Sequence, residues 1–205
     1  MHIVIVGLSH KTAPVEIREH LAFAPTAMQR PLQKMLELSP VAEGLIVSTC
    51  NRVEVILVTR DRRRAIEKTK TFLSQYNKIP LDQFDKTLYV HLNDAAVRHV
   101  FRVAASLDSL IVGEPQILGQ MKAAYREAIQ AKTSGVILNR LLHRAFFVAK
   151  RIRTETGIGD RAAGEGRPAG HHLQLLSAHS RSPHADRGAL PGQYVADLSG
   201  GSGHQ

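Results

Sequence analysis

The sequence predicts an α+β protein built on a ferredoxin-like antiparallel sheet, and three observations lead to this class. Two apolar, β-branched runs flank a short polar segment within residues 44–58, a pattern typical of a β-hairpin. A helical stretch separates this hairpin from one further strand on each side, over residues 3–8 and residues 88–92. The resulting order, β-α-β-β-α-β, is that of the split βαβ motif.

Local signals define the helices of this sheet domain, residues 1–92. Proline is tolerated in the first turn of a helix, and prolines open two short helices that we expect over Val15–Phe23 and Pro25–Leu38. A third helix is expected over residues 61–76. We expect these helices on one face of the sheet, with the polar segment of the hairpin at one end.

From residue 93 onward the apolar spacing becomes helical. Asn93 or Asp94 is expected to cap the first of three helices. The second helix begins at Glu114-Pro115, and the third runs from about Val136 to Thr154. Residues 93–156 are therefore expected to form a helical extension packed on the sheet domain.

The composition changes abruptly after Gly159. Residues 160–205 hold eight Gly, three Pro and five His but no Lys, and their apolar residues have no sustained period. Such a composition is typical of an unstructured segment. The histidines match no spacing of metal ligands, so we expect a solvated tail and no metal site.

Charge and cysteine content limit the classes of partner and compartment. The chain of 205 residues has a formal net charge of +9, and all of the surplus lies in residues 1–159, with 23 Lys+Arg against 14 Asp+Glu. Such a surplus favours an anionic partner such as nucleic acid. One cysteine excludes an internal disulfide. No apolar run is long enough to span a membrane, and the first residues lack an export signal, so we expect a cytoplasmic protein.

Cys50, the single cysteine, lies in the polar segment of the hairpin. Arg52 is two residues further on, and extended backbone would place its guanidinium near the thiol or near a substrate carboxylate. A cation stabilises the reactive thiolate, so Cys50 is a candidate nucleophile, with Thr49 and Asn51 as hydrogen-bonding neighbours. The alternatives are a small buried thiol for Cys50 and a surface ion pair with Glu54 for Arg52.

Further candidates lie in the helical extension. Gln116 and Gln120 are four residues apart and share a helix face, so with Ser109 and Glu114 they could line one polar wall. The alternative is an ordinary solvated face. His99 is a candidate general acid or base near neutral pH, and its alternative is a helix-surface histidine.

Two basic clusters are candidate phosphate contacts, with solvated charged faces as the alternative. The first cluster is Arg60, Arg62, Arg63 and Arg64, and the second is Arg140, Arg144, Lys150, Arg151 and Arg153.

Three segments, taken in their order and spacing, resemble the glutamyl-tRNA reductase family: Val6–Pro14, Ser48–Glu54 and Ser106–Gln120. The resemblance covers residues 1–159 and implies that residues 1–156 are the N-terminal catalytic domain of such an enzyme. The family is an oxidoreductase that reduces glutamyl-tRNA(Glu) to glutamate-1-semialdehyde with NADPH, the first step of tetrapyrrole (porphyrin) biosynthesis.

The resemblance also implies residue roles. The family forms a thioester between a cysteine and the glutamyl group, and Cys50 matches that cysteine, while His99 matches a histidine important for activity. It implies no metal. The family's substrate-binding positions correspond to Thr49, Asn51, Arg52, Ser109, Glu114, Pro115, Gln116 and Gln120.

The chain departs from the family's pattern beyond Gly159. There the family continues into a dinucleotide-binding domain and a dimerisation domain, and the sequence has no Gly-rich turn between a strand and a helix. We therefore expect substrate binding and thioester formation without NADPH binding, and a monomer where the family forms homodimers. Our hypothesis is that the reading frame changes near codon 159. The alternative function is a non-catalytic module that binds tRNA or a protein.

Overall fold

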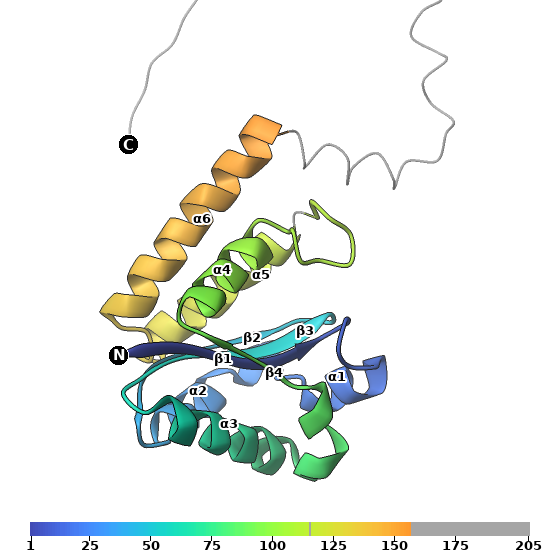
Figure 1. Ribbon diagram of the computed structural model, residues 1–205, viewed down its shortest axis with the longest axis vertical. Helices are drawn as coiled ribbons and strands as arrows, with labels where there is room; N and C mark the ends of the chain where they lie inside the picture. The colour runs from blue at the N-terminus through green and yellow to red at the C-terminus, as the bar shows by residue number, and fades with distance from the viewer. Residues whose placement is uncertain (115, 157–205) are drawn as a thin grey trace, which may run out of the picture. The chain divides into compact units, whose positions relative to one another are not determined.

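The computed structural model describes residues 1–114 and 116–156, which lie in one compact unit. The predicted order of strands and helices is confirmed (Figure 1). The expected tail, residues 160–205, lies outside the described residues. The elements are β1 (His2–Ser9), α1 (Val15–Leu21), α2 (Gln29–Leu36), β2 (Val41–Ser48), β3 (Arg52–Thr59), α3 (Arg62–Asn77), β4 (Tyr89–Leu92), α4 (Asp94–Ala104), α5 (Gln116–Gln130) and α6 (Val136–Thr156), with 3₁₀ turns at Pro25–Ala27, Leu81–Gln83 and Asp85–Thr87.

The four strands form one sheet in the order β2-β3-β1-β4, and every neighbouring pair is antiparallel. The β2–β3 hairpin is paired directly, whereas each helical connection skips one strand, as the predicted β-α-β-β-α-β order requires. Ile5 lies opposite Ile56, and Ile46 opposite Val55, so apolar residues pair across the central strands. The α+β class predicted from the sequence is confirmed.

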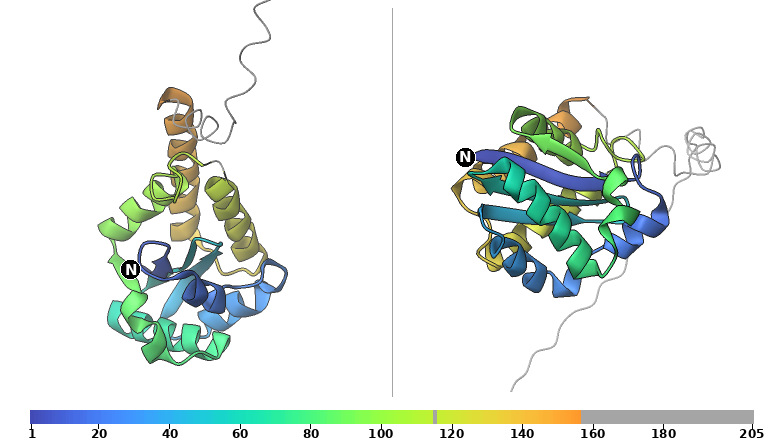
Figure 2. Two further views of the ribbon diagram at one scale, coloured as in Figure 1. Left: turned by 90° about the vertical axis from the view of Figure 1, so that its right-hand side faces the viewer. Right: turned by 60° about the horizontal axis from the view of Figure 1, so that its bottom comes forward.

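Helices cover both faces of this sheet (Figures 1 and 2). The helices α1, α2 and α3 lie on one face, as predicted for the sheet domain, and the helical extension α4–α6 lies on the other. All eight residues of β3 are consequently buried, including its polar ones. A strand at the centre of two helical layers can hold charged side chains away from water only if they are paired.

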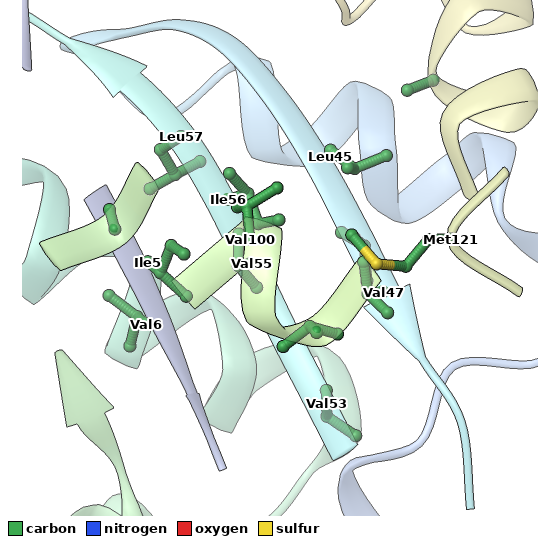
Figure 3. Close-up of a cluster of buried hydrophobic side chains, with 14 of the residues drawn as sticks. Ile5, Val6, Leu45, Val47, Val53, Val55, Ile56, Leu57, Val100 and Met121 are labelled. Carbon is green, nitrogen blue, oxygen red and sulfur yellow. The ribbon is translucent and has the colours of Figure 1, made fainter. Parts of the chain in front are cut away.

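The two helical layers and the sheet share one hydrophobic core (Figure 3). Val100 of α4 and Met121 of α5 belong to the same cluster as Val47 and Val55 of the hairpin, and each of the four side chains is at most 1 % exposed. Burying a side chain of this size stabilises the fold by about 1.5–3 kcal/mol. The helical extension is therefore part of the folded core.

The expected helix over Pro25–Leu38 is divided in the structure. Residues Pro25–Ala27 form a 3₁₀ turn, and α2 begins only at Gln29. Pro31 explains the division, because it lacks the N–H that would bond to the carbonyl of Ala27 and so favours the first turn of a new helix. The first and third helices of the sheet domain lie where the sequence places them, within two residues at each end.

Candidate active site at the end of the hairpin

Cys50 lies in the tight turn that joins β2 to β3. The Thr49 hydroxyl accepts hydrogen bonds from the backbone N–H groups of Asn51 (3.2 Å) and Arg52 (3.1 Å). The Thr49 N–H in turn donates to the carbonyl of Arg52 at 2.9 Å. These local bonds fix the turn and hold the Cys50 thiol exposed and free. The alternative of a buried structural cysteine is therefore wrong.

Arg52 is not extended beside Cys50, because residues 49–51 turn instead of continuing the strand. Its guanidinium is only 1 % exposed. Nη1 donates to Oε1 of Glu54 at 2.7 Å, and Nη2 donates to the backbone carbonyl of Asp108. The alternative of a surface ion pair is wrong, because the pair with Glu54 forms in the interior. Arg52 and Cys50 nevertheless line the same hollow.

One donor of Arg52 is not used. Its Nε is buried and has no hydrogen-bond partner within residues 1–114 and 116–156. Burial acts to lower the pKa of Arg52, but the nearby Glu54, Tyr89 and Asp108 raise it by a larger amount. The net pKa is therefore raised, and the guanidinium stays charged. An unsatisfied buried donor costs about 1–3 kcal/mol, and an acceptor brought by a ligand would offset that cost.

Glu54 is the central acceptor of a buried cluster that it forms with Arg52, Tyr89 and His99. It is 1 % exposed, and its Oε1 accepts from Arg52, from the Tyr89 hydroxyl and from Nε2 of His99. Burial acts to raise its pKa, but the His99 hydrogen bond and the Arg52 charge lower it to about 2. Glu54 therefore stays ionised at neutral pH, and its charge raises the pKa of Tyr89 together with burial.

A glycine makes room for this carboxylate. Gly7 of β1 lies opposite Glu54 in the β1–β3 register. A Cβ at Gly7 would lie 2.6 Å from the carbonyl oxygen of Val53 and 2.9 Å from Cα of Glu54. No larger residue fits there without moving the strand that carries Arg52 and Glu54.

His99 is buried, with 9 % exposure, and the alternative of a helix-surface histidine is wrong. On α4 it lies beside the positions Ala96, Val100 and Val103, which face the core. Its Nε2 lies 2.7 Å from Oε1 of Glu54. His99 is thus connected to Arg52 through a shared carboxylate and not through contact with Cys50.

The predicted polar wall meets the hairpin turn. A small hollow of about 20 Å³ is lined from both sides, and it brings together most of the candidate residues. His99 is not among them, and Pro115 lies outside the described residues. The lining residues are Thr49, Cys50, Asn51, Arg52, Ser109, Glu114, Gln116, Ile117 and Gln120.

Several residues of the cluster have no signal in the sequence that singles them out. Lys11 pairs with Asp108, which brings the loop after β1 to the segment after α4. The backbone N–H of His10 donates to the carbonyl of Asn51 at 2.8 Å, while its own Nδ1 is buried with no partner in the described part of the chain. Burial and the Arg52 charge lower the pKa of His10. The only signal for these residues is that they lie inside the segments Val6–Pro14 and Ser106–Gln120, which resemble the family.

The two basic clusters lie apart from the hollow. The first follows β3 at its last residue, whereas Cys50 precedes the first residue of that strand. The second lies along α6, where Arg151 pairs with Glu155 at 2.9 Å. Neither cluster is joined to the Cys50 turn by a hydrogen bond or ion pair among the described residues.

Residues 1–114 and 116–156 contain neither a candidate metal site nor a membrane-spanning helix. No group of His, Cys, Asp or Glu is arranged to hold a metal ion there. None of the helices in this part of the chain has the length and hydropathy needed to cross a bilayer.

Comparisons with other proteins agree with one another. Residues 6–156 match the family model described as "Glutamyl-tRNAGlu reductase, N-terminal domain". Glutamyl-tRNA reductases from Geobacter sulfurreducens and Geobacter metallireducens are 58 % and 59 % identical over 162 residues, 79 % of this chain and 37 % of each relative. A solved structure of glutamyl-tRNA reductase from Methanopyrus kandleri is similar, with a TM-score of 0.63 and 33 % identity over 76 % of this chain and 35 % of that one.

The chain therefore spans little more than a third of the length of these relatives. All three segments that carried the resemblance lie inside the matched range, and two of them, Ser48–Glu54 and Ser106–Gln120, line the Cys50 hollow. The chain belongs to the glutamyl-tRNA reductase family, of which it contains the N-terminal domain.

Proposed function

We propose that this chain accepts the glutamyl group of glutamyl-tRNA on Cys50. The observation that carries the proposal is the hollow in which the exposed thiol meets a charged guanidinium and a polar wall. The Cys50 thiolate attacks the ester carbonyl, so that a C–S bond forms and the C–O bond to the ribose breaks. The thiol proton ends on the ribose oxygen, and the product is a thioester, which is more reactive than the oxygen ester.

The residues around Cys50 suit the two charges of a glutamyl group. The free Nε of Arg52 can donate to a carboxylate, which would satisfy the buried donor. Glu114, half-buried in the same hollow, can accept from the substrate ammonium. The remaining proposed contacts are Thr49, Asn51, Ser109, Pro115, Gln116 and Gln120.

We propose that His99 acts mainly as a positioning residue. Its Nε2 is bonded to Glu54, and Glu54 in turn holds Arg52, so His99 fixes the guanidinium that faces the hollow. An acid–base role would need Nδ1, whose nearest charged neighbour is Asp108 at 3.9 Å.

Reduction of the thioester with NADPH to glutamate-1-semialdehyde, the first step of tetrapyrrole synthesis, is proposed for the complete family enzyme. The described residues do not fit a dinucleotide: the sheet is antiparallel, and the loop from Ser9 to Pro14 that follows β1 has no glycine. We assign no hydride step to them. We likewise propose that residues 1–156 form one domain, that the protein is cytoplasmic and that the complete enzyme forms homodimers.

The test is transfer of labelled glutamate from charged tRNA to the protein without NADPH. Label that stays with the protein after an acid quench, and is absent from the Cys50→Ser variant, is the expected result. The proposal is contradicted if the chain binds the charged tRNA but leaves its glutamyl ester intact and carries no label. That result would support the alternative of a non-catalytic binding module.

A further inference from the structure

A second and much larger cavity lies beside the Cys50 hollow. Its volume is about 460 Å³, within the usual range of small-molecule sites, and its walls come from the loop after β1, from β4 and from α4. The Cys50 hollow is much smaller, at about 20 Å³, so a nucleotide does not fit in it. The rest of a substrate that reacts at Cys50 must lie outside that hollow.

The two spaces meet at consecutive residues of the chain. Asp108 lines the large cavity, and the next residue, Ser109, lines the Cys50 hollow. Arg52 lines the Cys50 hollow and donates to the backbone carbonyl of Asp108. A ligand that spans this partition could therefore have one end at Cys50 and the other in the large cavity.

The large cavity carries positive charge that is not neutralised. Arg98 and Arg102 are four residues apart on α4, so they lie on one face, and both line the cavity. Both are exposed, and neither forms an ion pair within the part of the chain that the structure describes. The one carboxylate of the cavity, Asp108, is already paired with Lys11. Two adjacent free guanidiniums are well suited to a phosphate.

Flat rings form another part of the wall. The rings of His91 and His99 have centroids 4.5 Å apart, and Tyr89 lies 5.0 Å from His91 and 5.5 Å from His99. All three line the cavity. Burial, followed by the neighbouring His99, lowers the pKa of His91, which keeps its ring uncharged. Such rings are platforms for stacking a nucleobase.

We propose that this cavity is the subsite for the 3′-terminal nucleotide of the tRNA, with its base against Tyr89 and His91 and its phosphate on Arg98 and Arg102. The inference rests on the proposed function, because it is the ester at the terminal ribose that Cys50 attacks. It assigns to the cavity a nucleotide covalently attached to the group in the Cys50 hollow.

The test compares uncharged tRNA(Glu) with the same tRNA lacking its terminal adenosine, both titrated against the full chain. The complete tRNA is expected to bind about tenfold more tightly, as stacking of one base and contact of one phosphate allow. The Arg98→Gln/Arg102→Gln double variant is expected to bind the two RNAs equally, and His91→Ala is expected to reduce the preference. Equal binding of the two RNAs by the unmodified chain would overturn the proposal.

Arg140→Gln/Arg144→Gln on α6 is the matched control, because it removes the same charge at the same helical spacing away from the cavity. Any weakening that it causes is expected to affect the binding of both RNAs equally, so that the ratio of their affinities is unchanged. A lost ratio in this control would also count against the proposal, since the preference would then follow net charge. A different result would assign the cavity to a dinucleotide and overturn the proposal: NADPH binds the unmodified chain, the Arg98/Arg102 variant loses that binding, and the ratio of the two RNA affinities stays intact.

The two proposals fail separately. Uncharged RNAs carry no glutamate, so their ratio does not depend on Cys50. Label transfer to Cys50 without any preference for the terminal nucleotide would refute only the subsite. The preference without label transfer would refute only the thioester.

Discussion

Arg52 Nη1 and His99 Nε2 each lie 2.7 Å from the same atom, Oε1 of Glu54. The first comes from β3 and the second from α4, so one carboxylate oxygen joins the sheet to the helical layer above it. Because Glu54 is 1 % exposed, water cannot replace either partner without opening the core. The geometry of the Cys50 hollow is therefore determined jointly by two layers of the fold.

Replacement of Cys50 by Ser is expected to abolish transfer of glutamate to the protein and to leave tRNA affinity unchanged. The side chain is exposed and makes no structural contact that serine would lose, so the free energy of unfolding should change by less than about 0.5 kcal/mol. Label transfer, tRNA titration and urea unfolding on the same preparation provide the check. Equal labelling of both proteins would place the acceptor elsewhere.

Replacement of Arg52 by Met should destabilise the fold strongly. It leaves the Glu54 carboxylate buried without its cation, and breaking a buried pair typically costs about 3–5 kcal/mol. Urea unfolding at neutral pH measures the change. Arg151→Met, which breaks the exposed pair with Glu155, is the matched control and should leave the unfolding midpoint unchanged. Similar midpoints for both variants would show that the interior pair contributes little.

Stability should fall with acid in a way that depends on Glu54. Its pKa is lowered from 4.5 to about 2 in the folded state, so its stabilising contribution is complete above the unfolded pKa of about 4.5. That contribution is lost as the pH falls toward about 2. Glu54→Gln should be less stable than the parent near neutral pH, and the difference should shrink below about pH 4.5. A gap that stays constant between pH values of roughly 6 and 3 would contradict this assignment.

The contact between Gly7 and Glu54 predicts different effects for two glycine substitutions. Gly7→Ala places a Cβ against backbone atoms of Val53 and Glu54, so it should lower stability by about 1–3 kcal/mol and weaken glutamate transfer. Gly119→Ala on α5 meets nothing within 4 Å and should raise stability by about 0.5–1 kcal/mol. Thermal unfolding of the two variants measures both changes in stability. If Gly7→Ala leaves stability unchanged, β1 and β3 must separate easily at this position.

The sheet and the polar wall could be predicted because their signals are local. The β-branched runs around Cys50 specify a hairpin, and the spacing of Gln116 and Gln120 specifies a shared helix face. The buried cluster could not be predicted, because its bonds join residues far apart in the chain. Arg52 reaches the carbonyl of Asp108, 56 residues away, and His99 meets Glu54 across 45 residues. The alternation of residues around Arg52 predicts its position in a strand, but it does not predict that the side chain is buried.

The helical layer over the second face of the sheet also has a consequence for how the chain is made. A ribosome releases residues 1–92 first, and at that stage all four strands exist while α4, α5 and α6 do not. The face that carries Val47 and Ile56 beside Glu54, which Val100 and Met121 later cover (Figure 3), is then bare apolar surface, and the Glu54 carboxylate lacks its His99 partner. The nascent sheet is consequently exposed to aggregation until about sixty more residues have emerged. We therefore expect the domain to need a chaperone during synthesis, because of the order in which these layers appear.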